Sequence, residues 1–170
     1  DMKDYLADDL IVPIKVRKSG YRTVFEKEAT CKDYTTTDIK EEMAKRIRIT
    51  AQNISGIVEE SDILNPFRYG LFSIIVISHK LFRLLVPIFL ILIFLSSSTM
   101  AYYSVEFLII LLLQVLFYAI GILGYFINKI IKFSLGNSVC YFCLSNLSIL
   151  LGIVKFIRGT KFATWQTVRP

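Results

Sequence analysis

The sequence predicts a mixed α/β region followed by an α-helical membrane region, and three observations lead there. Helix-like and strand-like patterns alternate over residues 1–66. Residues 84–102 and 105–127 are almost entirely apolar, and each run is long enough for the roughly 20 residues of a bilayer crossing. Residues 1–66 hold 11 Lys and Arg against 13 Asp and Glu, whereas residues 67–170 hold nine against Glu106 alone. The net charge of +6 therefore flanks apolar runs, which indicates a membrane and not a nucleic acid as the partner.

An acidic pair, Asp8 and Asp9, opens the first expected helix, which can run to about Lys18. Asp is a preferred N-cap residue, and acidic side chains near a helix N-terminus suit its dipole. The pair is therefore either a helix cap or a pair of carboxylates for acid/base or metal chemistry. Pro13 lies early enough in the helix to be tolerated, and Ser19-Gly20 ends it.

Two short strands are expected next. Residues 21–25 alternate in character and are β-branched and aromatic, as a strand requires. Residues 29–34 form the second expected strand, after a turn at residues 26–28. Together with the flanking helices, these strands make the first 66 residues an α/β region.

A second helix is expected after Asp38, which with Glu41 resembles a capping box. Apolar residues then keep helical spacing at Ile39, Met43, Ile47, Ile54 and Ile57. One face carries Lys45, Arg46 and Arg48, and on charge alone this face is a solvated surface. Asn65-Pro66 ends the region.

The membrane region begins with residues 67–83, where Arg68, His79, Lys80 and Arg83 alternate with apolar residues. This mixture is typical of an interfacial amphipathic helix that leads into a span, with His79 at the level of the lipid headgroups. The transmembrane region covers residues 84–157. It holds two spans and a third candidate, residues 139–157, which is marked by Asn146 and several Ser residues.

The orientation of the spans contains a conflict. Lys129 and Lys132 place the middle loop in the cytoplasm, and the soluble first part with it. The same rule places the basic tail, residues 158–170, inside, whereas three crossings put it outside. Either the last segment is re-entrant or interfacial, or the charges of the tail are overridden.

The three cysteines form no disulfide framework. Cys140 and Cys143 have the spacing of a redox or zinc motif, but they lie in an apolar segment without a second Cys or His pair, so buried apolar side chains are expected. The chain begins with Asp1, and we expect it to be a piece of a longer protein.

Several short motifs follow one another in a fixed order. They are Ala7-Asp8-Asp9, VRKSGYRTVF at 16–25, Lys45-Arg46-Ile47-Arg48-Ile49, NPFRYG at 65–70 with Ser78-His79-Lys80, and Arg158-Gly159-Thr160-Lys161 with Trp165. This order resembles the C-terminal half of membrane-anchored family-two glycosyltransferases, the group that includes cellulose, hyaluronan and poly-N-acetylglucosamine synthases. The resemblance covers most of the chain. It implies that residues 1–66 are the C-terminal part of a cytoplasmic catalytic domain of GT-A (Rossmann-like) fold.

The resemblance also implies roles for individual residues. In that family the last Asp of the acidic motif is the general base, which takes the proton of the acceptor hydroxyl as it attacks the anomeric carbon with inversion. Carried over, Asp9 is the candidate base and Asp8 its neighbour. The Arg of the family's Gln-x-x-Arg-Trp motif binds the departing diphosphate, a role that falls on Arg48, with Arg46 as a second candidate.

Two departures modify these expectations. Ile49 replaces the Trp that stacks on the acceptor sugar, and Lys45 replaces the Gln, which favours transfer of a single sugar to a membrane-associated or envelope glycan or lipid. The Asp-x-Asp motif that holds Mg²⁺ or Mn²⁺ on the nucleotide-sugar donor is expected outside these residues, so the fragment alone is expected to be inactive.

A non-enzymatic membrane protein is the alternative. It would be a channel or transporter subunit, or an anchor or scaffold whose soluble part docks a partner. Few ionisable groups lie within the spans, so no lined ion path is evident. In either case we expect a multi-pass protein of the cell membrane with its soluble part in the cytoplasm.

Overall fold

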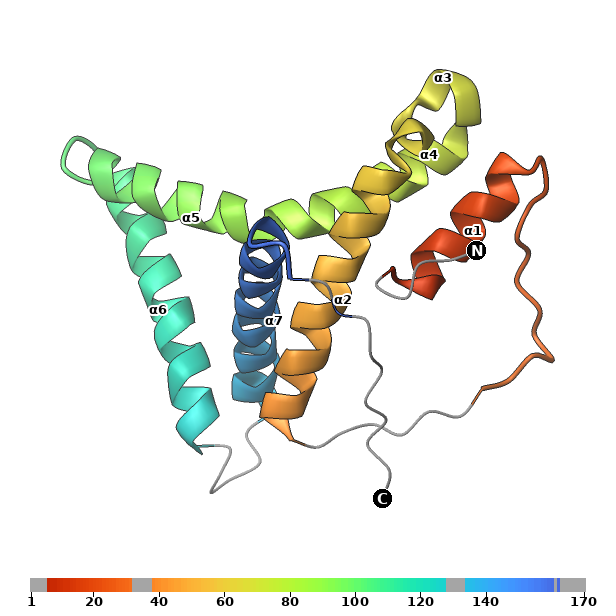
Figure 1. Ribbon diagram of the computed structural model, residues 1–170. Helices are drawn as coiled ribbons and strands as arrows, with labels where there is room; N and C mark the ends of the chain where they lie inside the picture. Colours follow the sequence, from red (N-terminus) through yellow and green to blue (C-terminus); the bar gives the residue numbers. More distant parts are fainter. Residues whose placement is uncertain (1–5, 32–37, 128–133, 161, 163–170) are drawn as a thin grey trace. The chain divides into compact units, whose positions relative to one another are not determined.

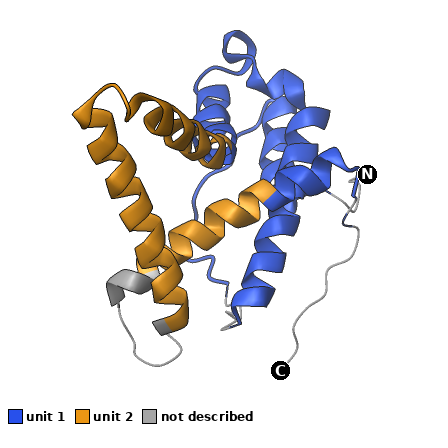
Figure 2. Ribbon diagram, turned by 90° about the vertical axis from the view of Figure 1, so that its left-hand side faces the viewer, with its two compact units in different colours: residues 1–84, 151–170 blue, residues 85–150 orange. Residues whose placement is uncertain are grey.

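The computed structural model describes residues 6–31, 38–127, 134–160 and 162. Within these residues every regular element is helical (Figure 1). The chain divides into two compact units, coloured separately in Figure 2. Unit 1 comprises residues 1–84 and 151–170, and unit 2 comprises residues 85–150.

Unit 1 is assembled around one apolar cluster. Its elements are α1 (Asp8–Lys18), α2 (Ile39–Glu59), the 3₁₀ turn η1 (Ser61–Leu64), α3 (Pro66–Tyr69), α4 (Leu71–Val76), the π-helical turn η2 (Ile77–Leu81), the start of α5 (Phe82–Met100) and the end of α7 (Ser134–Ile157). One or more side chains from each of α1, α2, η1, α3 and α4 meet in the cluster, which consists of Ala7, Leu10, Ile14, Ile57, Ile63, Tyr69 and Val76. Burial of apolar surface contributes about 25 cal/mol per Å², so this cluster is what holds α1 onto the following helices.

The first predicted helix is confirmed, but its predicted cap is wrong. Helix α1 starts at Asp8, and Ala7 occupies the N-cap position without a side-chain hydrogen bond. Both carboxylates therefore lie in the first turn, where they interact with the helix dipole instead of capping the backbone. The predicted end is confirmed: Gly20 has φ +86°, and the N–H groups of Gly20 and Tyr21 donate to carbonyls of the last turn.

The predicted α/β fold is wrong. Residues 21–31 form no strand, and the side chains of Tyr21, Val24 and Phe25 are 71%, 75% and 88% exposed. The rest of the second predicted strand, residues 32–34, lies outside the described residues. A strand needs a neighbour for its N–H and C=O groups, and the described residues supply none. The expected GT-A (Rossmann-like) portion requires a sheet, and it is corrected here to a helical arrangement.

The second predicted helix is confirmed as α2. The Asp38 carboxylate caps it by accepting a hydrogen bond from the Lys40 N–H at 2.9 Å. Helix α2 ends at Glu59, six residues before the predicted break. Asn65 instead caps α3, because its side-chain oxygen accepts from the Phe67 N–H at 3.0 Å and Pro66 fills the first helical position.

Unit 2 consists of α5 from Leu85 onward, α6 (Val105–Ile127) and α7 up to Leu150. Helices long and apolar enough to cross a membrane are called membrane-type helices. Three helical segments of the described chain are long and apolar enough to cross a membrane: Leu71–Met100, Val105–Phe126 and Ser138–Ile157. The helices expected for the two spans and for the third candidate are therefore confirmed. Gln114 of α6 donates to the Leu90 carbonyl of α5 at 3.1 Å, which joins two of these helices.

Candidate functional site

The acidic pair lies on the outside of unit 1. Asp8 and Asp9 are exposed, whereas Leu10, Ile11 and Ile14 on the opposite face of α1 are buried. Two backbone bonds, from the Leu10 and Ile11 N–H groups to the Ala7 carbonyl, fix the first turn. The carboxylates are thus accessible, while the helix that carries them is anchored by its apolar face.

Asp9 has a partner that the sequence did not reveal. Lys80, in the turn η2, places its Nζ 3.2 Å from Asp9 Oδ2, although the two residues are 71 positions apart. The Asp9 and Lys80 side chains are 65% and 35% exposed. An ion pair this exposed contributes about 0–1 kcal/mol to stability, so α1 is kept in place by its apolar face and not by this pair.

Helix α1 rests on the C-terminal part of α2. A Cβ atom at Gly56 of α2 would come within 2.9 Å of Ile11 Cδ1 and 3.4 Å of Leu10 Cδ2. The absence of a side chain at Gly56 therefore allows the two helices to approach closely. This contact, together with the apolar cluster, determines where the acidic pair stands.

The candidate diphosphate-binding arginines lie elsewhere on α2. Arg46 and Arg48 are half-buried, and Arg46 Nε donates to Glu42 Oε1 at 2.8 Å. Arg48 precedes Gly56 by eight residues, which is about 12 Å along a helix axis. The acidic pair and the arginines therefore occupy different helices, and the arginines are set back from the point where α1 meets α2.

No metal-binding group is present among the described residues, where no three His, Cys, Asp or Glu side chains gather closely enough to hold an ion. Asp8 and Asp9 do not by themselves make such a site. The described residues therefore do not form a divalent-cation site.

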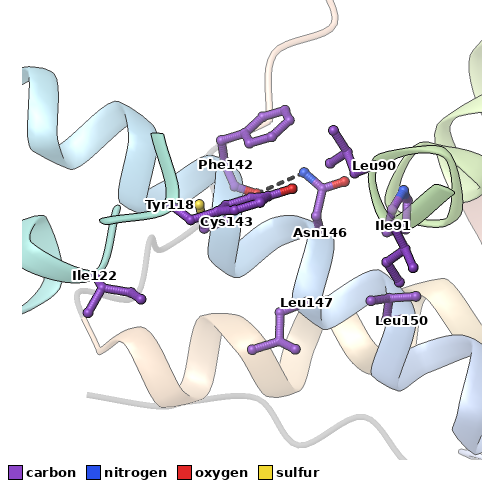
Figure 3. Close-up of a pocket in the computed structure, with 10 residues that line it drawn as sticks. Leu90, Ile91, Tyr118, Ile122, Phe142, Cys143, Asn146, Leu147 and Leu150 are labelled. Carbon is purple, nitrogen blue, oxygen red and sulfur yellow. Dashed lines mark hydrogen bonds between the residues drawn. The ribbon is translucent and has the colours of Figure 1, made fainter. Parts of the chain in front are cut away.

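Unit 2 contains a cavity of about 310 Å³ that the sequence did not predict (Figure 3). Its wall is apolar apart from Tyr118, Asn146 and Cys143, and it comprises Pro87, Leu90, Ile91, Tyr118, Ile122, Phe142, Cys143, Asn146, Leu147 and Leu150. Asn146 Nδ2 donates to the Phe142 carbonyl at 2.9 Å, and the Tyr118 hydroxyl accepts from Gln114 Nε2 at 3.2 Å. In the sequence, Asn146 is only a polar interruption of an apolar run.

The cysteine pair of α7 serves packing. Cys140 is buried, and Cys143 lies where a Cβ on Gly121 of α6 would come within 2.9 Å of its Sγ. Both are free thiols, as is the exposed Cys31. The side chains therefore fill space between membrane-type helices, in agreement with the sequence interpretation.

Comparison of the chain with protein-family models, with curated proteins and with solved structures finds no match.

Proposed function

We propose that this chain is part of an inverting glycosyltransferase, which transfers a sugar from a nucleotide-diphosphate sugar to a membrane-associated or envelope glycan or lipid. The observation that carries the proposal is the setting of Asp9. Its carboxylate is exposed on an anchored first turn and is held by Lys80, which lies in the turn leading to the first membrane-type helix. The order of motifs along the chain supports the same proposal.

The proposed reaction uses Asp9 as general base. The Asp9 carboxylate accepts the proton of an acceptor hydroxyl while the hydroxyl oxygen attacks the anomeric carbon of the donor. The bond from that carbon to the diphosphate oxygen breaks with inversion, and the electron pair leaves on the diphosphate. Arg48, with Arg46, binds the departing diphosphate through charge-assisted hydrogen bonds. The other donor-binding residues, and those for Mg²⁺ or Mn²⁺, are proposed to lie outside this sequence; the cation would neutralise diphosphate charge.

The proposal places the protein in the cell membrane, with residues 1–66 on the cytoplasmic side. Three helices long and apolar enough to cross a membrane support a membrane location. Lys129 and Lys132, between the second and third of them, support the cytoplasmic assignment through the excess of basic residues in cytoplasmic loops.

The test is the Asp9→Asn variant of the full-length protein in membranes supplied with a panel of nucleotide sugars. Loss of a general base should reduce sugar transfer by at least about a hundredfold, while nucleotide-sugar binding persists. Glu41→Gln is the matched control, because Glu41 is also an exposed carboxylate in a first helical turn, on α2. Wild-type turnover in Asp9→Asn would remove Asp9 from the mechanism.

Arg48→Ala tests the second role. Loss of a charge-assisted hydrogen bond to the diphosphate should weaken nucleotide-sugar binding by about tenfold. Unchanged affinity would contradict that assignment. If no nucleotide sugar is bound or consumed by the wild-type protein, the chain belongs to the non-enzymatic alternative of a transporter subunit, anchor or scaffold.

A further inference from the structure

The segment from Leu71 to Arg83, here called the entry segment, has one face directed into unit 1. It comprises α4, η2 and the first two residues of α5. Ser73 and Val76 are 0% and 5% exposed, and Lys80 reaches Asp9 from the same side. The next position in this helical series, Leu84, packs against the apolar cluster. One face of the entry segment is therefore packed against the rest of unit 1.

A second face is apolar but uncovered. Leu71, Ile74, Ile75 and Phe82 recur at helical spacing and are 77%, 52%, 54% and 55% exposed. Phe67, just before the entry segment in α3, is 101% exposed. Large apolar side chains gathered on the side opposite a packed core mark an interaction surface.

A basic edge adjoins the apolar face. His79 and Arg83 are exposed one turn apart, and the Arg68 side chain is 67% exposed. Asp62 Oδ2 lies 3.8 Å from Arg68, but Asp62 is already bonded to Lys18 and Tyr69. The sequence contains no acidic residue between Asp62 and Glu106. Arg68 therefore shares Asp62 with Lys18, and Arg83 contributes an exposed charge to this edge.

Length argues that the entry segment lies outside the hydrocarbon core. The continuous helical run Leu71–Met100 has 30 residues, about 45 Å at 1.5 Å per residue. The hydrocarbon core of a bilayer is about 30 Å thick. The part of α5 after Arg83, residues 84–100, covers about 26 Å of that thickness at 1.5 Å per residue, so the entry segment extends beyond the core on the side of unit 1.

We propose that the entry segment lies in the interfacial layer of a membrane that contains anionic phospholipids. The apolar face enters the boundary between headgroups and acyl chains, and Arg68 and Arg83 contact lipid phosphates. Of the possible partners, an anionic membrane surface matches both the apolar face and the basic edge, and α5 continues directly from the segment. The proposal does not rest on sugar transfer, although it brings the Asp9–Lys80 pair to the membrane surface.

The test reconstitutes the full chain into vesicles of phosphatidylcholine and into vesicles with about a third of it replaced by phosphatidylglycerol. Amide hydrogen exchange of residues 71–83 is measured in both. Each basic residue near an anionic surface is worth about fivefold in binding. We therefore expect exchange to slow by about tenfold or more in the anionic vesicles and added salt to abolish the difference. Equal exchange in the two vesicle types would overturn the proposal.

Charge variants supply the control. Arg68→Gln with Arg83→Gln should remove the dependence on phosphatidylglycerol. Lys155→Gln with Arg158→Gln, which removes the same charge from the exposed end of α7, should retain it. A dependence that survives the first pair would refute the role of the basic edge. If a variant does not fold, the salt series on the unaltered chain tests the same role: a difference between the vesicle types that persists in high salt would refute the basic edge.

Discussion

At the scale of single residues, Lys18 connects the end of α1 to the turn η1. Its Nζ donates to both Glu60 and Asp62, and the Tyr69 hydroxyl donates to Asp62 Oδ2 at 3.0 Å. Partial burial lowers the pKa of Lys18, but the hydrogen bonds with Asp62 and Glu60 outweigh this effect and raise the pKa above 10.5. The hydrogen bond from Lys18, opposed by desolvation and aided by Tyr69, lowers the pKa of Asp62 below 3.8.

These directions predict a pH window for the docking of α1. A lowered pKa in the folded state means that the contribution of Asp62 is present above pH 3.8 and is lost as the pH falls through its folded pKa. A raised pKa means that the contribution of Lys18 is present below pH 10.5 and is lost as the pH rises through its folded value. In wild-type protein, the protection of α1 amides from hydrogen exchange should fall as the pH is lowered. Asp62→Asn should make this fall at acidic pH smaller. Glu28→Gln, in the segment without regular structure that follows α1, should leave the fall in protection at acidic pH unchanged.

Lys80 allows a separate test of how Asp9 is held. Lys80→Ala should change thermal stability little, because the pair is largely exposed. Under the proposed function it should lower the turnover number by about ten- to hundredfold at unchanged nucleotide-sugar affinity, since a misplaced base loses reactivity and not binding. Lys80→Arg should recover most of the rate. Equal turnover in all three proteins would mean that Lys80 does not position Asp9.

At the scale of the elements, two glycines set how closely helices approach α2. A Cβ on Gly152 of α7 would come within 2.6 Å of Thr50 Cβ and 2.9 Å of the Ile47 backbone oxygen. A Cβ on Gly56 would instead meet Ile11 Cδ1 at 2.9 Å, the end of a flexible side chain. A side chain at Gly152 could be accommodated only if a helix backbone moved. A side chain at Gly56 could be accommodated by a small movement of the Ile11 side chain.

The two substitutions to Ala should therefore differ in outcome. Gly152→Ala should destabilise the packing of α7 on α2 by about 1–3 kcal/mol, the usual cost of overpacking. Gly56→Ala should be close to neutral, because the gain of roughly 1 kcal/mol in helix propensity offsets a small adjustment of Ile11. Thermal unfolding in one detergent would measure both. A larger loss for Gly56→Ala would contradict the contacts described for Gly152.

The elements that could be predicted from the sequence were those specified locally. Helix α2 follows from an Asp38 cap and apolar residues at helical spacing, and the membrane-type helices follow from length and composition. The strand at residues 21–25 had the correct local pattern, but a sheet depends on a distant partner, which the pattern does not contain. The pairing of Asp9 with Lys80 was equally hidden, because it depends on how η2 turns back toward α1. The roles of Asp9 and Arg48 came from resemblance, and they stay predictions.

At the scale of the whole molecule, the contacts of α7 bear on the orientation conflict in the sequence. Gly152 lies against Ile47 and Thr50 of α2, and Gln52 Nε2 donates to the Phe162 carbonyl at 3.1 Å. Six charged side chains lie in the first half of α2, between Lys40 and Arg48, so that half is expected outside the hydrocarbon core. We therefore expect the end of α7 to lie on the same side of the membrane as α2.

This arrangement predicts two crossings instead of three. Two crossings, by α5 and α6, return the chain to the side of the basic loop with Lys129 and Lys132. Helix α7 then starts and ends on that side, although it is long and apolar enough to cross. The excess of basic residues in the tail agrees with this placement, because the basic loop and the basic tail are both expected on the cytoplasmic side.

Labelling with a membrane-impermeant maleimide would check the topology. Cys31 reports the side of the connection between α1 and α2, and an Arg158→Cys substitution in a Cys31→Ser background reports the side of the tail. With two crossings, both positions should react in inside-out vesicles and neither in right-side-out vesicles. The Cys31→Ser protein without the second substitution shows how much Cys140 and Cys143 contribute. Reaction of the two positions from opposite sides would mean that α7 crosses the membrane, and that Gly152 and Thr50 are not in contact there.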